Sequence, residues 1–148
     1  VLLAVSLLLR MPSAGVFSHN DEGVGSIFYR LEDIPAQAKL DAILILGGGP
    51  PSSLEEPPLF VQKRCDDAYA IMKKQAAAAA DTTVPILCIS AGTTHMPQSM
   101  NQRGLPVWES TASAAYLKKK YNLDSNLYVE TTSYDTISNA YFARTSHT

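Results

Sequence analysis

The sequence predicts an α/β fold, a Rossmann-like, doubly wound and mainly parallel sheet with helices between its strands. Apolar runs typical of buried strands alternate with stretches of helical periodicity, and the first run ends in three glycines. The length of 148 residues suits one domain with a core of its own. Three strand-helix units are visible, and we expect the final strand or strands of such a sheet to lie beyond Thr148.

The first strand is predicted over Ala42 to Leu46, a continuous apolar run that indicates a strand covered on both faces. The first helix follows a Pro-rich loop over residues 59–80, where Phe60, Arg64, Ala68 and Met72 recur at helical spacing. This pattern and the run before it define the first strand-helix unit.

Two further units follow. PILCISAG contains the second strand, and WESTASAAYLKKKY is a helix with three lysines in its last turn, where they favour the negative end of the helix dipole. NLYVE is the third strand, also expected to be buried, and it leads directly into a third helix. The order strand, helix, strand, helix, strand, helix predicts right-handed crossovers.

We divide the chain into three parts. Residues 1–15 are an apolar segment, either the remnant of a signal peptide or membrane anchor or a buried element of the fold. Residues 16–40 are an N-terminal extension, with a short amphipathic helix predicted around GSIFYRLEDI. We expect residues 41–148 to be an α/β domain that is incomplete at its C-terminus. The apolar start favours a membrane-associated or secretory location over a cytoplasmic one, and membrane association through it is one expectation.

The composition is that of an ordinary soluble domain, with 18% charged residues and a formal net charge of −2. A charge this close to zero does not indicate a nucleic-acid partner. Cys65 and Cys88 lie in a helical and a strand pattern, so we expect small buried apolar side chains rather than a disulfide framework or a metal site.

The glycine run does not match the common nucleotide motifs. After Gly47 and Gly49 the dinucleotide-binding pattern needs a glycine or alanine where Ser52 stands, and two prolines separate the strand from its helix. The lysine and hydroxyl residue of a P-loop are also missing from this stretch. The glycines therefore indicate either close approach of a ligand to the backbone or a plain turn.

Two other catalytic patterns are only weakly matched. Ser90 in CISAG is similar to a nucleophile elbow, but Cys88 stands where that motif needs glycine. A metal site built from His95, Glu109 and His147 lacks ligand pairs at helical spacing, and we predict no metal.

The positions of polar residues are more informative than any single motif. The three predicted strands end in GGG, SAGTT and ETTSYDT. Ligands of open parallel sheets bind beyond the carboxyl ends of the strands, so these residues predict a crevice there. The alternative is ordinary loop and capping chemistry, with Ser133 as the helix N-cap and Glu109 near a helix dipole. Thr136 and Asn139, three residues apart, are predicted to point into the crevice together.

The order of these segments resembles the YdcF-like family, bacterial proteins with a domain of unknown function. The resemblance covers residues from about 41 to the end and rests on DAILILGGG, an arginine in the first helix, ILCISAG, a helix-initial glutamate and VETTSYDTISNAYFAR. The last segment is the most specific, matching Glu-x-x-Ser-x-(Asn/Asp)-Thr-x-x-Asn-Ala. Ala91 departs from the family's Ser-Gly-Gly.

The resemblance implies a Rossmann-like fold with a polar cleft at the strand ends. Glu109 and Glu130 are the candidate catalytic carboxylates. The candidate ligand-binding residues are Gly47, Gly48, Arg64, Ser90, Gly92, Thr93, Ser133, Asp135, Thr136 and Asn139. The cofactor stays unknown.

Two functions are expected. In the first, the domain binds a small polar or nucleotide-like ligand and acts as a hydrolase or transferase if it catalyses a reaction. In the second, it is a non-catalytic membrane- or envelope-associated factor whose polar cluster only links loops.

Overall fold

The computed structural model describes residues 31–34, 40–78 and 84–146, and it confirms the predicted fold class. Three strands form one parallel sheet in the order β1 (Ile43–Leu46), β2 (Ile86–Ile89) and β3 (Leu127–Val129). They alternate with the helices α1 (Leu59–Ala78), α2 (Glu109–Tyr121) and α3 (Thr136–Ser146), and a short 3-10 helix spans Leu31–Asp33. The predictions for residues 1–15 and for most of 16–40 fall outside the described residues.

The strands are in parallel register, which places their carboxyl ends at one edge of the sheet. Ile43 is paired with Ile86 and Cys88 with Val129. The ladder continues past the assigned strands, because the amide of Gly47 donates to Ile89 O at 3.0 Å and the amide of Glu130 to Cys88 O at 2.9 Å. The first residues of all three strand-end loops are therefore neighbours in space.

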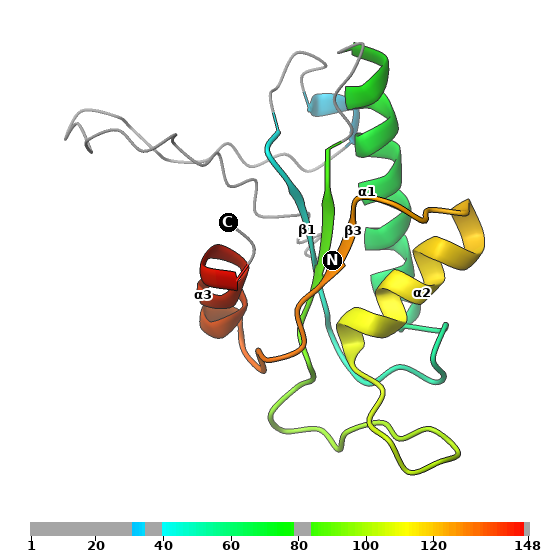
Figure 1. Cartoon of the computed structure of the whole chain (residues 1–148), viewed down its shortest axis with the longest axis vertical. Coiled ribbons are helices and arrows are strands. Elements are labelled where there is room, and N and C mark those ends of the chain that lie inside the picture. The colour runs from blue at the N-terminus through cyan, green and yellow to red at the C-terminus, as the bar shows by residue number, and fades with distance from the viewer. Residues whose placement is uncertain (1–30, 35–39, 79–83, 147–148) are drawn as a thin grey trace, which may run out of the picture.

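The helices cover both faces of the sheet. In Figure 1, α1 and α2 lie on one side of the strands and α3 lies on the other, which is the arrangement of a doubly wound fold. Strand alternation matches it: Ile43 and Ile45 face the larger core, and Leu44 packs with Ala143 of α3 on the opposite face. This accounts for the continuous apolar run of β1.

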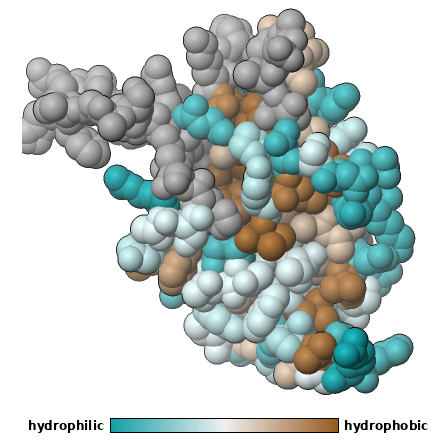
Figure 2. Space-filling view, viewed as in Figure 1, coloured by the Kyte–Doolittle hydropathy of each residue, from teal (hydrophilic) through white to brown (hydrophobic). Residues whose placement is uncertain are grey.

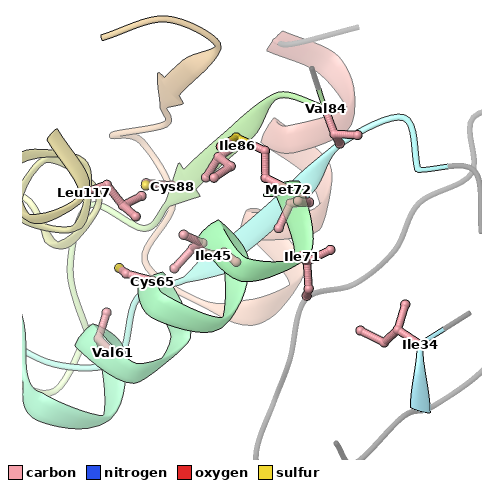
Figure 3. Packing of buried hydrophobic residues seen from close by; sticks show 12 residues of the cluster. Ile34, Ile45, Val61, Cys65, Ile71, Met72, Val84, Ile86, Cys88 and Leu117 are labelled. Carbon is pink, nitrogen blue, oxygen red and sulfur yellow. The ribbon is translucent and has the colours of Figure 1, made fainter. Parts of the chain in front are cut away.

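The larger core lies between the sheet and the pair α1 and α2 (Figure 3). Ile71 and Leu117, from the two helices, are 1% and 0% exposed. Cys65 and Cys88 lie in the same core and are both fully buried as free thiols, as predicted. This core packs α1 and α2 against the sheet.

β3 differs from its prediction as a buried strand. Tyr128 and Val129 are 50% and 39% exposed, and Leu127 is half-buried. An edge position alone is not the reason, because β1 is also an edge of the described sheet and is buried. Leu127 packs against the larger core, whereas Tyr128 and Val129 belong to neither core cluster, and the smaller cluster under α3 contains residues of β1 and β2. Aromatic and β-branched residues favour strand formation without revealing whether the strand is central or at an edge.

Large apolar side chains reach the surface at the strand-end side of the molecule. Figure 2 shows brown atoms beside hydrophilic ones at its lower end, over the loops that follow β1 and β2. The exposed apolar residues of these loops and of the first turn of α1 are Leu54, Leu59, Phe60, Met96, Met100 and Leu105.

Candidate functional site at the carboxyl edge of the sheet

Glu109 is the centre of the first polar cluster. It is the first residue of α2, whose N-terminus is held at the end of β2 because the amide of Ser110 donates to Ser90 O at 2.9 Å. The Glu109 carboxylate is 3% exposed. Its Oε1 accepts from the Gly49 amide at 3.0 Å and from Thr93 Oγ1 at 2.9 Å, and its Oε2 accepts from Ser90 Oγ at 3.1 Å. The carboxylate therefore links the loops after β1 and β2, and we call these four residues the Glu109 cluster.

Gly47 makes room for this carboxylate. A Cβ atom at position 47 would lie 2.3 Å from Glu109 Oε2 and 2.7 Å from the Cβ of Ser90, both far too close. The sequence predicted either close approach of a ligand to the glycine backbone or a plain turn, and at Gly47 the group that approaches is the protein's own carboxylate. Gly49 needs to be glycine for a different reason, because its φ of +123° is a backbone conformation that residues with a side chain rarely adopt.

Arg64 of α1 closes the end of β1. Its Nη1 donates to Leu46 O at 2.9 Å and to Gly47 O at 2.8 Å. Burial lowers the pKa of the guanidinium, and the charge of nearby Glu109 acts in the opposite direction. The predicted ligand-binding arginine is therefore a half-buried cation fixed against backbone carbonyls.

Ser90 adopts a backbone conformation that is rare for a residue with a side chain, with a φ of 104°. It directly follows β2, and its hydroxyl lies 3.1 Å from both Glu109 Oε2 and Gly92 O. A strained serine directly after a strand is one feature of a nucleophile elbow. In such an elbow the amide of the next residue donates a hydrogen bond to the oxyanion of the reaction. Here that amide belongs to Ala91 and donates to Ser133 O at 2.7 Å. This geometry gives little support to acyl-enzyme chemistry.

Glu130 is the centre of a second cluster, at the end of β3. The carboxylate is 3% exposed and accepts from the Ser133 amide at 3.0 Å, from the Thr132 amide and from Ser133 Oγ. Burial alone would raise the pKa of Glu130. Hydrogen bonds from Ser133, from the Thr132 amide and from the Ser90 backbone outweigh that effect and hold the pKa below its ordinary value of 4.5.

Asn139 completes this second cluster, which we call the Glu130 cluster (Glu130, Thr132, Ser133 and Asn139). Its Oδ1 contacts Ser133 Oγ, and both residues are buried. Ser133 has one hydroxyl hydrogen and so can donate to only one of its two oxygen neighbours at a time. The two clusters meet at Ser90 and Ala91, through the amide of Ala91 that bonds Ser133 O.

The N-cap of α3 is Asp135, and the prediction of Ser133 was wrong. Asp135 Oδ1 accepts from the Ser138 amide at 2.8 Å, and Ser138 Oγ accepts from the Asp135 amide at 3.2 Å, a reciprocal capping arrangement. Ser133 is instead buried among the oxygens of Glu130 and Asn139. The spacing of Asp135 and Ser138 is the sequence signal that would have identified this cap.

Thr136 and Asn139, which were predicted to point into the crevice together, differ in burial. Asn139 is 8% exposed, whereas Thr136 is an exposed first residue of α3. Positions three apart differ by about 60° around a helix, which at the rim of a sheet separates a buried side chain from an exposed one. Of the other predicted residues, Gly48 is exposed, and Gly92 is buried beside Gln98 and Tyr134.

Phe60 is a neighbour of the site that was predicted only as one of the residues recurring at helical spacing in the first helix. In the structure it is 53% exposed and lies against Gly48 and Arg64. Helical spacing alone does not predict the exposure of Phe60. It identifies residues on one side of α1 but does not show that the first turn of the helix extends past the sheet.

Within the described ranges, no group of three or more histidine, cysteine or acidic residues is placed to hold a metal ion, and His147 lies outside those ranges. In the same ranges no helix is long and apolar enough to cross a membrane. No protein-family model, no curated protein and no solved structure matches the chain.

Proposed function

We propose that the chain binds a small polar or nucleotide-like ligand at the carboxyl ends of β1, β2 and β3, in the manner of the YdcF-like family that its motifs resemble. The supporting observation is the meeting of two buried carboxylates, Glu109 and Glu130, around the strained backbone of Ser90. Buried charge and backbone strain at the ligand-binding edge of a parallel sheet are costly features that often accompany function.

Each group has a role in this proposal. The exposed backbone of Gly48 and the guanidinium of Arg64 receive an anionic part of the ligand. Glu109 accepts a ligand hydroxyl group or a proton, since a carboxylate has about four acceptor sites and the loop donors use three of them. Glu130 does the same when the Ser133 hydroxyl donates to Asn139 Oδ1 instead. If a reaction follows, a hydrolase or transferase fits these groups best.

One observation favours the alternative, a non-catalytic membrane- or envelope-associated factor whose polar cluster is structural. The oxygens of both carboxylates already accept hydrogen bonds from the loops after all three strands. Such links alone would explain why polar groups are buried here.

Thermal-shift measurements on the whole chain separate the two. The panel contains nucleotides, S-adenosyl compounds and sugar phosphates, tested on the wild type, Glu109→Gln, Asn139→Ala and the exposed control Glu56→Gln. If the chain binds such a ligand, at least one compound should raise the melting temperature of the wild type and of the control. The same compound should not raise the melting temperature of either site variant. Strong destabilisation of both site variants, with no compound shifting the wild type, would establish the structural alternative.

A further inference from the structure

Phe60 presents an exposed aromatic ring at the rim of the candidate site. Phe60 lies in the first turn of α1, directly beyond the carboxyl end of β1, and is 53% exposed. Aromatic rings are among the side chains that gain most from burial, so an exposed ring beside buried polar clusters needs an explanation.

The ring is held on two sides. A Cβ atom at position 48 would lie 2.7 Å from Phe60 Cε2 and 3.3 Å from Cζ, so one ring edge rests directly on the Gly48 backbone. The guanidinium carbon of Arg64 is 5.3 Å from the ring centroid, within cation-π range. That guanidinium is itself fixed by Leu46 O and Gly47 O at 2.9 and 2.8 Å. The ring is therefore oriented before any ligand arrives.

This arrangement leaves part of the ring open to solvent beside Gly48, whose backbone is also exposed. Within the described residues, Arg64 uses only Nη1 for hydrogen bonds, so its other nitrogen donors can meet an anion. The acidic residues of the same loop are engaged elsewhere, Glu55 with Lys119 at 2.6 Å and Glu56 with Ser52. The exposed ring of Phe60 can therefore contact a planar ring of a ligand, and Arg64 beside it can contact an anionic group of the same ligand.

We propose that Phe60 is a stacking platform for the planar ring of the ligand, which makes that ligand a nucleotide rather than a simple sugar phosphate. The inference rests on the proposed function and deepens it. The base stacks on Phe60, and the phosphate lies toward Arg64 and the backbone of Gly48. Gly48 is a positioning residue here, because any side chain at 48 displaces the ring.

The test compares two probes that differ by the base alone, the nucleoside 5′-monophosphates and ribose 5-phosphate, by isothermal titration calorimetry on the whole chain. We expect Phe60→Leu to weaken nucleotide binding by about tenfold or more while leaving ribose 5-phosphate unchanged, as loss of one stacked base requires. Gly48→Ala should weaken the binding of both probes, because its Cβ atom would displace the ring and would also lie 3.2 Å from Arg64 Nη1, where the phosphate is placed. The matched control is Leu59→Ala, the neighbouring residue, which is 81% exposed, and it should change neither affinity.

The outcomes are distinguishable. Equal weakening of both probes by Phe60→Leu, or no weakening of the nucleotide, overturns the stacking role while the proposed function stands. The stacking role is also overturned if the wild type binds ribose 5-phosphate as tightly as it binds every nucleotide. If neither probe binds the wild type, the inference is overturned, and the panel of the preceding section then decides whether the proposed function survives with another ligand. Circular dichroism of each variant confirms that it is folded.

Discussion

At the residue scale, Ser90 carries an unusual combination of strain and hydrogen bonding. Its φ of 104° lies where residues with a side chain rarely occur, and its hydroxyl bonds the carboxylate of Glu109. A structure keeps such a conformation only when its surroundings enforce it, and here the amides of Ala91 and Ser110 anchor the loop on both sides. Two substitutions separate the contribution of the backbone strain to stability from that of the hydroxyl hydrogen bond.

We predict that Ser90→Gly is more stable than Ser90→Ala by about 1–2 kcal/mol, because both lose the hydroxyl but only glycine relieves the backbone strain. Urea unfolding followed by circular dichroism gives the difference. The control pair is Ser125→Gly and Ser125→Ala, at an exposed position without positive φ. There the glycine variant should be the less stable of the two. A Ser90→Ala variant as stable as Ser90→Gly would mean that the conformation carries no strain.

Glu130 makes the stability of the same edge dependent on pH. Its pKa in the folded protein lies below the ordinary value of 4.5. A group with a lowered pKa stabilises the fold above its unfolded pKa, and this contribution is lost as the pH falls through the folded value. The stabilisation is therefore complete at neutral pH and declines below about pH 4.5.

We predict that Glu130→Gln lowers the free energy of unfolding at neutral pH by about 1–3 kcal/mol, since the buried amide of Ser133 and the partly buried amide of Thr132 lose a charged acceptor. The difference from wild type should shrink as the pH is lowered toward about 3. Urea titrations across this range measure it, and the exposed control Glu56→Gln should show little change at neutral pH. A difference that stays constant down to the lowest pH would contradict the lowered pKa.

At the element scale, the connection between α1 and α2 holds Glu109 at the sheet. Asp66 of α1 accepts from Tyr116 Oη at 3.0 Å, from Tyr121 Oη at 2.8 Å and from Lys120 Nζ at 2.8 Å, all on α2. The ring of Tyr121 also stacks on Tyr69 with centroids 3.9 Å apart. These contacts surround one carboxylate with three donors and so fix the two helices against each other.

We predict that Asp66→Ala destabilises the protein by about 1–2 kcal/mol, allowing for solvent screening of a group that is 35% exposed. The neighbouring control Asp67→Ala breaks a single pair at 3.4 Å with Lys63, whose side chain is 62% exposed, so it should cost about 0.5 kcal/mol or less. Thermal unfolding of both variants provides the comparison. Equal effects would show that the three donors from α2 contribute nothing beyond a surface ion pair.

The elements themselves were largely predictable, because each depends on local pattern. The apolar run of β1 and the periodicity of α1 identify their type, and the lysines at the end of α2 mark its last turn. The exposure of β3 was not predictable, since it depends on which strands the helices cover. Likewise, the strand endings indicated where polar groups gather, but the inward turn of Glu109 and the burial of Ser133 follow from contacts between distant loops.

At the scale of the whole molecule, the core contains two thiols that report on global opening. Cys65 of α1 and Cys88 of β2 are both 0% exposed and belong to the core between the sheet and α1 and α2. Burial raises the pKa of Cys65 to about 12 and that of Cys88 well above its ordinary value. Because alkylating reagents attack the thiolate, the folded state protects both groups by exclusion of the reagent and by suppressed ionisation.

We predict that iodoacetamide labels neither cysteine of the native protein at about pH 8 except through transient unfolding, so that both react at similar rates. If opening is fast relative to labelling, the rate follows the equilibrium population of the open form. Asp66→Ala should then accelerate both labelling rates by about five- to thirtyfold, in proportion to its loss of 1–2 kcal/mol, and Asp67→Ala by about twofold at most. Mass spectrometry of peptides containing each cysteine measures the two rates separately. Labelling of Cys65 alone, unaffected by Asp66→Ala, would show that α1 opens locally and that the two helices and the sheet do not unfold as one cooperative unit.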